Sequence, residues 1–195
     1  MSYGVAGYSI FVYGTKPLGA SVHPEMKTVF EQNKIGIYSH IFASLFTLLL
    51  GPFQLSTYFR KKHIKWHRIG GMAYLLIGVL IGGVSGLYMA LHAYGGMTSH
   101  FGFSLLSITW LFTGFMALYS IRKRDIENHR KWMIRNFSLS FGAVTLRIYL
   151  GLFFAFGYTF EQFYPLLAWL AWVPNLLFVE WLFCESKKPG KLHDN

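Results

Sequence analysis

Charged residues are scarce in this sequence. Only 13% of its 195 residues are Asp, Glu, Lys or Arg, whereas 53% are hydrophobic. A soluble globular domain carries about 25% charged residues, so this shortage excludes an ordinary soluble domain and indicates long apolar segments. From the length we expect one compact bundle without a separate soluble domain.

Cysteine and the familiar catalytic motifs are also lacking. The single cysteine, Cys184, excludes a disulfide framework and a CxxC redox pair. There is no HExxH metal motif, no glycine-rich phosphate loop after a strand and no serine nucleophile elbow. The N-terminus has neither a basic region nor a cleavage site, so no removable signal peptide is expected. No catalytic residue can be named, and whether the protein is an enzyme stays open.

Five apolar stretches approach or exceed the ~20 residues that a helix needs to cross ~30 Å of hydrocarbon. They are residues 36–59, 69–94, 101–121, 137–158 and 165–184. A backbone in lipid must satisfy its own hydrogen bonds, which requires helices. The sequence therefore predicts an all-α integral membrane protein, an antiparallel bundle of five transmembrane helices.

The chain divides into three regions on this prediction. Residues 1–35 form a short apolar segment followed by an extracytoplasmic linker, residues 36–184 form the bundle, and residues 185–195 form a basic cytoplasmic tail. Residues 3–15 are uncharged but too short to span comfortably. A sixth crossing by this N-terminal segment is left open.

The basic residues predict the orientation of the bundle. Five Lys or Arg lie in residues 60–68, six lie in residues 122–135, and three follow Cys184. Such short basic runs between apolar segments are orientation signals, which argues against nucleic-acid binding in spite of the net charge of +10. The positive-inside rule places both basic loops and the C-terminus in the cytoplasm.

A polar or small stripe runs along the first predicted crossing. His40, Ser44, Thr47, Gly51 and Gln54 recur at helical spacing. This stripe is expected to face protein, either as a packing seam with hydrogen bonds or as the wall of a polar intramembrane cavity. An ionisable group inside a membrane is a functional hypothesis by default, which singles out His40.

A ridge of small residues follows in the second crossing, where Gly78, Gly82, Gly86 and Ala90 recur every four residues. Such a ridge lets another backbone approach closely. The sequence leaves open whether it serves an internal contact or a dimer.

Histidines are grouped at two predicted depths. His67 and His129 lie at the ends of the two basic loops, and His40 and His100, with His92 near them, lie toward the other side. Two imidazoles at one depth on separate helices are typical axial ligands of a haem iron. The best predicted pair for a haem b is His67 with His129, with His40 as a third ligand or a proton-carrying group and His100 as a further candidate.

Arginines near the predicted helices have two interpretations. Arg68, Arg130 and Arg135 are expected to contact lipid phosphates, as basic loops do. Arg147 lies inside a predicted crossing, where it needs a partner. It either pairs with Glu180 or holds an anion such as a propionate, or a quinone carbonyl.

Several segments in order resemble one bacterial family of predicted membrane proteins, domain of unknown function 2306. They are GPFQ (51–54), KWHRIGGMAY (65–74), GLYMALHAYGG (86–96), HRKWMIRNFSLSFGAVTLR (129–147) and AWVPNLLFVEW (171–181). The resemblance implies a helical bundle in the bacterial inner membrane and no particular activity. Members usually begin with a full transmembrane helix, from which the short N-terminus here departs. The positions that match the family pattern are His40, Gln54, His67, Arg68, His129, Arg130, Arg135 and Arg147.

Two hypotheses for function follow. The first is a haem-binding electron-transfer protein, whose architecture is loosely similar to that of the transmembrane cytochromes b, with a quinone or another redox partner. The alternative is a non-enzymatic small transporter or accessory subunit with a polar cavity lined by His40, Gln54 and Arg147. Substrate and oligomeric state stay open, and no metal other than a haem iron is expected.

Overall fold

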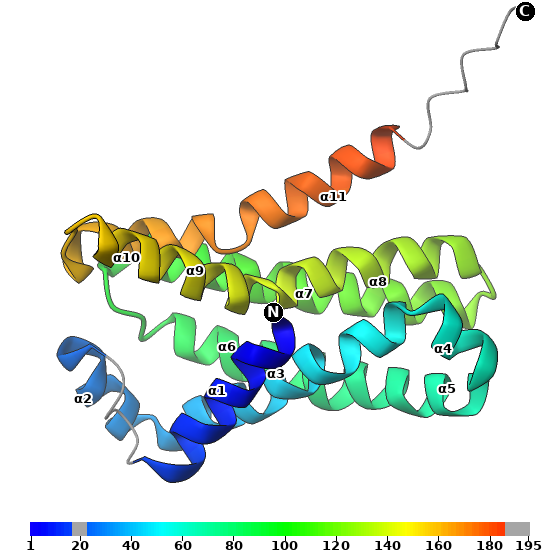
Figure 1. Cartoon of the computed structure of the whole chain (residues 1–195), viewed down its shortest axis with the longest axis horizontal. Helices are drawn as coiled ribbons and strands as arrows, with labels where there is room; N and C mark the ends of the chain where they lie inside the picture. Colours follow the sequence, from blue (N-terminus) through cyan, green and yellow to red (C-terminus); the bar gives the residue numbers. More distant parts are fainter. Residues whose placement is uncertain (17–22, 186–195) are drawn as a thin grey trace, which may run out of the picture.

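The computed structural model describes residues 1–16 and 23–185, and these residues form helices joined by short turns, without a strand among them (Figure 1). In chain order the helices are α1 (Ser2–Thr15), α2 (Pro24–Gln32), α3 (Lys34–Leu55), α4 (Thr57–Lys62), α5 (Ile64–Ala73), the π-helix η1 (Tyr74–Ile81), α6 (Gly82–Ala90), α7 (Gly96–Arg122), α8 (Ile126–Ser140), α9 (Gly142–Ala155), α10 (Phe160–Leu170) and α11 (Val173–Glu185).

Five helical segments in the described residues are long and apolar enough to cross a membrane. They are Lys34–Leu55, Ile64–Ala90, Gly96–Arg122, Ile126–Ala155 and Phe160–Cys184. The prediction of an all-α bundle with five crossings is confirmed. The last crossing consists of α10 and α11, and Pro174 lies in the first turn of α11, where a missing backbone N–H costs least.

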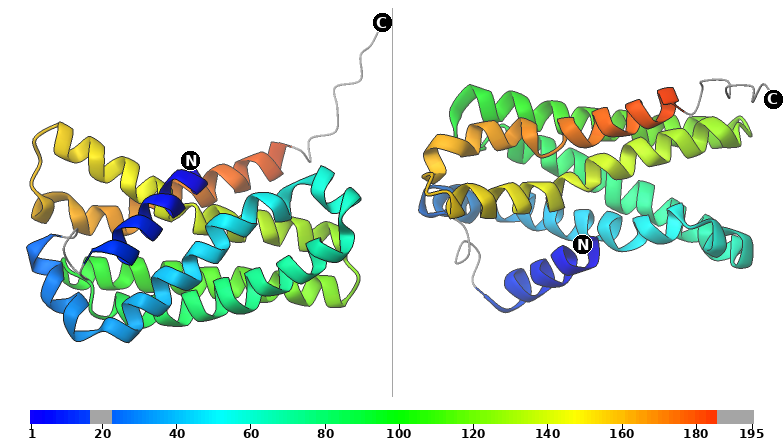
Figure 2. Two further views of the ribbon diagram at one scale, coloured as in Figure 1. Left: turned by 60° about the horizontal axis from the view of Figure 1, so that its bottom comes forward. Right: turned by 45° about the horizontal axis from the view of Figure 1, so that its top comes forward.

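The N-terminal segment forms α1, whose 14 residues extend about 21 Å at 1.5 Å per residue, too short for the ~30 Å hydrocarbon core. It lies obliquely against the outside of the bundle, in contact with α3 and α9 (Figure 2). Ser2, Ala6, Ser9 and Val12 form its buried face.

The crossings form a ring in which α3 packs against the α5–η1–α6 segment and against α8, while α7 packs against α6, η1 and α8. The glycine ridge lies inside this ring. An added Cβ would come within 2.5 Å of Thr47 at Gly78, 3.1 Å of Trp110 at Gly82 and 2.9 Å of the His40 ring at Gly86. The ridge therefore serves internal packing of α6 and η1 against α3 and α7.

The two basic segments are more helical than the sequence indicated. Residues 60–68 include parts of α4 and α5, and residues 126–135 already belong to α8. The carboxylate of Asp125 caps α8 by accepting from the backbone N–H of Asn128 at 3.0 Å. Hydrogen bonds from Asn128 also lower the pKa of the Asp125 carboxyl, which keeps it ionised at the helix N-terminus.

The predicted linker contains a helix that the sequence did not indicate. Residues 16–35 were expected to be a linker, but they contain α2, with His23 at its N-cap and Pro24 at its first position. The basic tail after Glu185 lies outside the described residues.

The bundle has two ends of different composition. The basic end carries α4, the start of α5 and the α7–α8 turn, and the opposite end, the cavity end, carries α2, the α6–α7 connection and the start of α10 (Figure 1).

Candidate ligand-binding cavity at His40

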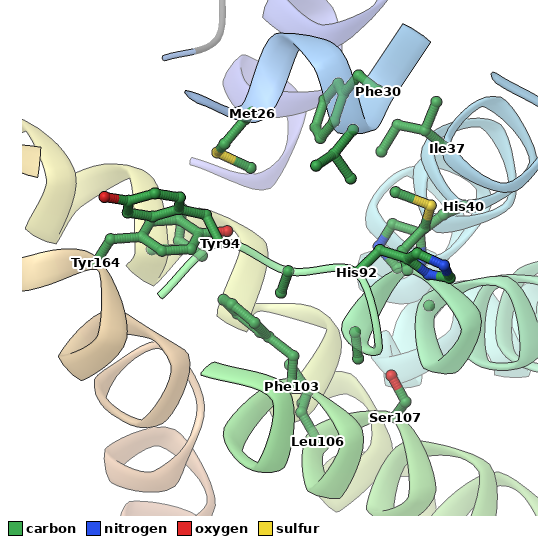
Figure 3. A pocket seen from close by; sticks show the side chains of 16 residues that line it. Met26, Phe30, Ile37, His40, His92, Tyr94, Phe103, Leu106, Ser107 and Tyr164 are labelled. Atoms are coloured by element: carbon green, nitrogen blue, oxygen red, sulfur yellow. The ribbon is translucent and has the colours of Figure 1, made fainter. Parts of the chain in front are cut away.

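The cavity end contains a partly open space of about 190 Å³ between α2, α3, α6, α7, α9 and α10 (Figure 3). Its walls are mainly aliphatic and aromatic, with Phe30, Phe103 and Leu106 among them. Polar groups come from His40, His92, Ser107, Tyr94 and Tyr164. None of the described side chains that line it carries a carboxylate.

His40 on α3 is held in one tautomer. Its Nδ1 lies 2.8 Å from the carbonyl oxygen of Gly82. Because a carbonyl only accepts, Nδ1 carries the hydrogen, and in the neutral ring Nε2 keeps a free lone pair. The absent side chain of Gly86 makes room for the ring, since a Cβ there would lie 2.9 Å from both Cε1 and Nδ1.

His92 and Ser107 complete the polar wall. The Nδ1 of His92 lies 2.9 Å from the carbonyl oxygen of Tyr88, so its Nε2 is also free of the hydrogen in the neutral ring. His92 is exposed, which places it at the mouth of the cavity. The same Cβ at Gly86 would lie 3.1 Å from the Oγ of Ser107, so this hydroxyl is close to the His40 ring.

His100 does not join His40. Its Nε2 contacts the carbonyl oxygen of Ala93 at 2.8 Å, and it is not among the residues that line the cavity. The structure therefore brings His92, rather than His100, to the same space as His40. Of the predicted stripe, Ser44 is half-buried and Thr47 is buried, and the Thr47 hydroxyl donates to the carbonyl of Ser44 within α3.

At the basic end, Gln54 holds His67. The hydrogen-bonding groups around the buried amide fix its orientation, with the nitrogen 3.0 Å from both Nδ1 and the carbonyl oxygen of His67, and the oxygen 3.2 Å from the backbone nitrogen of Gly71. Because the amide donates to Nδ1 of His67, the hydrogen of the neutral imidazole is on Nε2. His129 is anchored differently, since its Nδ1 lies 2.8 Å from the carbonyl oxygen of Ala117.

These contacts bear on the predicted haem. A haem iron binds an unprotonated ring nitrogen, and His67 offers none while Gln54 donates to its Nδ1. Haem binding stays a prediction, and the residues as placed do not fit it.

The structure corrects the expected pairing of Arg147 with Glu180. Glu180 pairs with Arg135, which makes one short contact through Nε and a second through Nη2 at 2.8 Å. Arg147 donates to the carbonyl of Ala143 on its own helix at 2.8 Å and to the hydroxyl of Ser9 on α1 at 3.3 Å. Sequence spacing could not reveal this, because it does not specify that α11, which carries Glu180, packs against α8.

Arg135 was expected to contact lipid phosphate, and its position corrects that expectation. Its side chain is half-buried between α8 and α11, where its guanidinium stacks on the rings of Trp132 and Phe183 as well as pairing with Glu180. Arg68 and Arg130, in contrast, are exposed at the basic end, which suits a contact with lipid headgroups.

A buried hydrogen-bond network was not found from the sequence. The Tyr74 hydroxyl donates to the Oδ1 of Asn136 at 2.9 Å, Asn136 donates to Thr113 at 2.9 Å, and the Trp110 indole donates to Ser140 at 2.9 Å. All five residues are buried. Its one sequence signal was Asn136, which directly precedes the predicted crossing of residues 137–158. Each polar side chain of this network has a hydrogen-bond partner, and the network joins η1, α7 and α8.

A family model described as "Predicted membrane protein (DUF2306)" matches residues 37–183, more than half of the chain. No curated protein and no solved structure matches.

Proposed function

The chain belongs to the DUF2306 family of predicted membrane proteins and is a multi-pass membrane protein, and we propose that it binds a quinol in the cavity at His40. The observation that carries this proposal is the free Nε2 lone pair of His40 in an apolar space. It differs from the alternative drawn from the sequence, a small transporter or accessory subunit with a polar cavity lined by His40, Gln54 and Arg147, because only His40 of these three lines the cavity.

A quinol matches the chemistry of this cavity. Its flat apolar ring suits the aromatic and aliphatic walls, and its hydroxyl groups donate hydrogen bonds. Nε2 of neutral His40 is an acceptor that such a hydroxyl can reach, and Ser107 supplies a hydroxyl nearby. The lipid-soluble tail of a quinol would remain in the bilayer.

The same tautomer predicts selectivity between redox forms. A quinone has carbonyl oxygens that only accept hydrogen bonds, so it gains nothing from the lone pair of His40. The cavity should therefore bind the reduced form more tightly than the oxidised form. An O-methylated quinol, which has the same ring but no hydroxyl, should also bind weakly.

The basic end gives the proposed orientation. By the positive-inside rule its loops lie in the cytoplasm, which places the cavity toward the outer side of a bacterial inner membrane. The C-terminus is then cytoplasmic, and a quinol would enter from the bilayer or from the outer interface.

The test is equilibrium binding to the purified protein in lipid nanodiscs. The probes are a short-chain ubiquinol analogue kept reduced, its quinone and its dimethyl ether. His40→Leu should weaken quinol binding about tenfold, the cost of one lost hydrogen bond in an apolar site. The matched control is His63→Leu, which makes the same change at an exposed position of the basic end. Equal affinity for the quinol and the dimethyl ether would contradict the proposal, as would an unchanged affinity in His40→Leu.

A further inference from the structure

Met89 lines the cavity together with His40 and His92. Gly36 and His40 lie one helical turn apart on α3. Gly36 faces Met89 of α6, and His40 faces Gly86 of α6. A Cβ at Gly36 would lie 3.1 Å from the Sδ of Met89, just as a Cβ at Gly86 would lie 2.9 Å from the His40 ring. Met89 is therefore about one helical turn from His40 across the α3–α6 contact, and His92 follows three residues after Met89.

All three side chains line the same cavity, and Figure 3 shows the imidazoles of His40 and His92 at one end of it. Each imidazole is anchored through Nδ1 to a backbone carbonyl, that of Gly82 or of Tyr88. This is the outer-shell arrangement of metal-binding histidines, because it fixes the ring and leaves Nε2 for the metal.

The donor set indicates which metal. Two neutral imidazoles and a thioether bring no negative charge, and no described lining side chain supplies a carboxylate. Thioether ligands select soft ions, whereas Mg²⁺, Ca²⁺ and Mn²⁺ favour oxygen ligands. From this juxtaposition we propose that His40, Met89 and His92 bind Cu(I), with the exposed His92 as the first contact for an incoming ion.

This site goes beyond quinol binding and does not depend on it. The two ligands share only the Nε2 of His40, so they should compete there. Met89 is assigned to the metal alone, and Ser107 to the quinol alone. Substitutions at these two positions therefore separate the proposals.

The metal test uses the full-length protein in nanodiscs, stripped of metal and kept anaerobic under a reductant. Cu(I) is titrated against bicinchoninate, which forms a coloured Cu(I) complex, and the copper retained by the protein is measured. One equivalent should be retained. Met89→Leu should weaken Cu(I) binding by roughly tenfold or more, the scale of a perturbed metal site. It should weaken quinol binding by less, because it changes the cavity wall but removes no hydrogen-bond partner of the quinol.

Two variants serve as controls. Met26→Leu makes the same change at another cavity residue, which packs against the Phe160 and Tyr164 cluster away from His40 (Figure 3), and should keep Cu(I) affinity. Ser107→Ala should weaken quinol binding and keep Cu(I). Failure of the wild type to hold Cu(I) against the chelator would overturn the site, as would equal losses in Met89→Leu and Met26→Leu. Neither result would affect the quinol proposal.

Discussion

The two ends of the bundle carry the same residue type in opposite settings. At the cavity end, His40 and His92 each donate from Nδ1 to a carbonyl, which leaves the lone pair of Nε2 free in the neutral ring. At the basic end, His67 accepts at Nδ1 from Gln54, whose side chain occupies the space beside it. The difference lies in the neighbours, because a glycine beside His40 leaves room and a glutamine beside His67 fills it. What a histidine can do in a membrane protein therefore depends on which ring nitrogen is anchored, and on the space beyond the other.

Adding a methyl group at Gly86, beside the cavity, should have the largest effect on quinol affinity. In Gly86→Ala the new Cβ would meet the His40 ring at 2.9 Å and the Ser107 hydroxyl at 3.1 Å. The ring must turn away from Gly82, so quinol affinity should fall by about 10- to 100-fold through the lost hydrogen bonds. Binding in nanodiscs measures the loss, and thermal unfolding should show about 1–3 kcal/mol of destabilisation from overpacking.

Gly151→Ala is the matched control for that change, because nothing lies within 4 Å of a Cβ at position 151 of α9. It should keep both stability and affinity, and it removes one helix glycine as Gly86→Ala does. If Gly86→Ala bound quinol like Gly151→Ala, the ring would not need its contact with α6, and the contrast between the two ends would be wrong.

Removing the Gln54 amide at the basic end should have a smaller effect, on stability and not on ligand affinity. Gln54 is 6% exposed and bridges the carbonyl of His67 and the backbone N–H of Gly71. Gln54→Met keeps the length of the side chain but leaves these buried groups without their partner, at a cost of about 1–3 kcal/mol. Thermal unfolding should detect the loss, while quinol and Cu(I) affinities at the far end stay unchanged.

Gln32→Met, an exposed glutamine of α2, is the control for that measurement and should leave stability unaltered. A large fall in ligand affinity in Gln54→Met would show that the two ends are coupled through α3. The two ends would then not be independent sites, because a change at one end would be transmitted to the other through α3.

The fold was largely predictable from sequence because hydrophobic length and basic loops are local signals. All five crossings were found, although the one that begins with α8 starts at Ile126 instead of residue 137. The cause is the cap at Asp125 and the ion pair between Glu127 and Lys131, which extend a helix into charged sequence. Helix α2 was missed because it is short and has few apolar residues.

The site was less predictable because it depends on contacts between crossings. His40 was identified by its place in an apolar segment, but whether His92 or His100 accompanies it depends on the turn after α6. Met89 carried a usable signal that was overlooked, since Gly86, Met89 and His92 recur every three residues. The pairing of Glu180 with Arg135 depends on which crossings are neighbours, which composition and periodicity do not specify.

The smallest expected effect tests the predicted haem at the basic end directly. His129→Gln removes one hydrogen bond, from Nδ1 to the carbonyl of Ala117, and should cost about 1 kcal/mol of stability. Quinol affinity should not change, and the absorption spectrum of the reduced protein, purified from cells supplied with haem, should match that of the wild type. Sharp α and β bands that vanish in His129→Gln would contradict this expectation. They would require the Gln54 amide to release Nδ1 of His67, so that the imidazole could take the other tautomer. The cofactor would then bind at the basic end, which is the opposite of what the ring tautomers indicate.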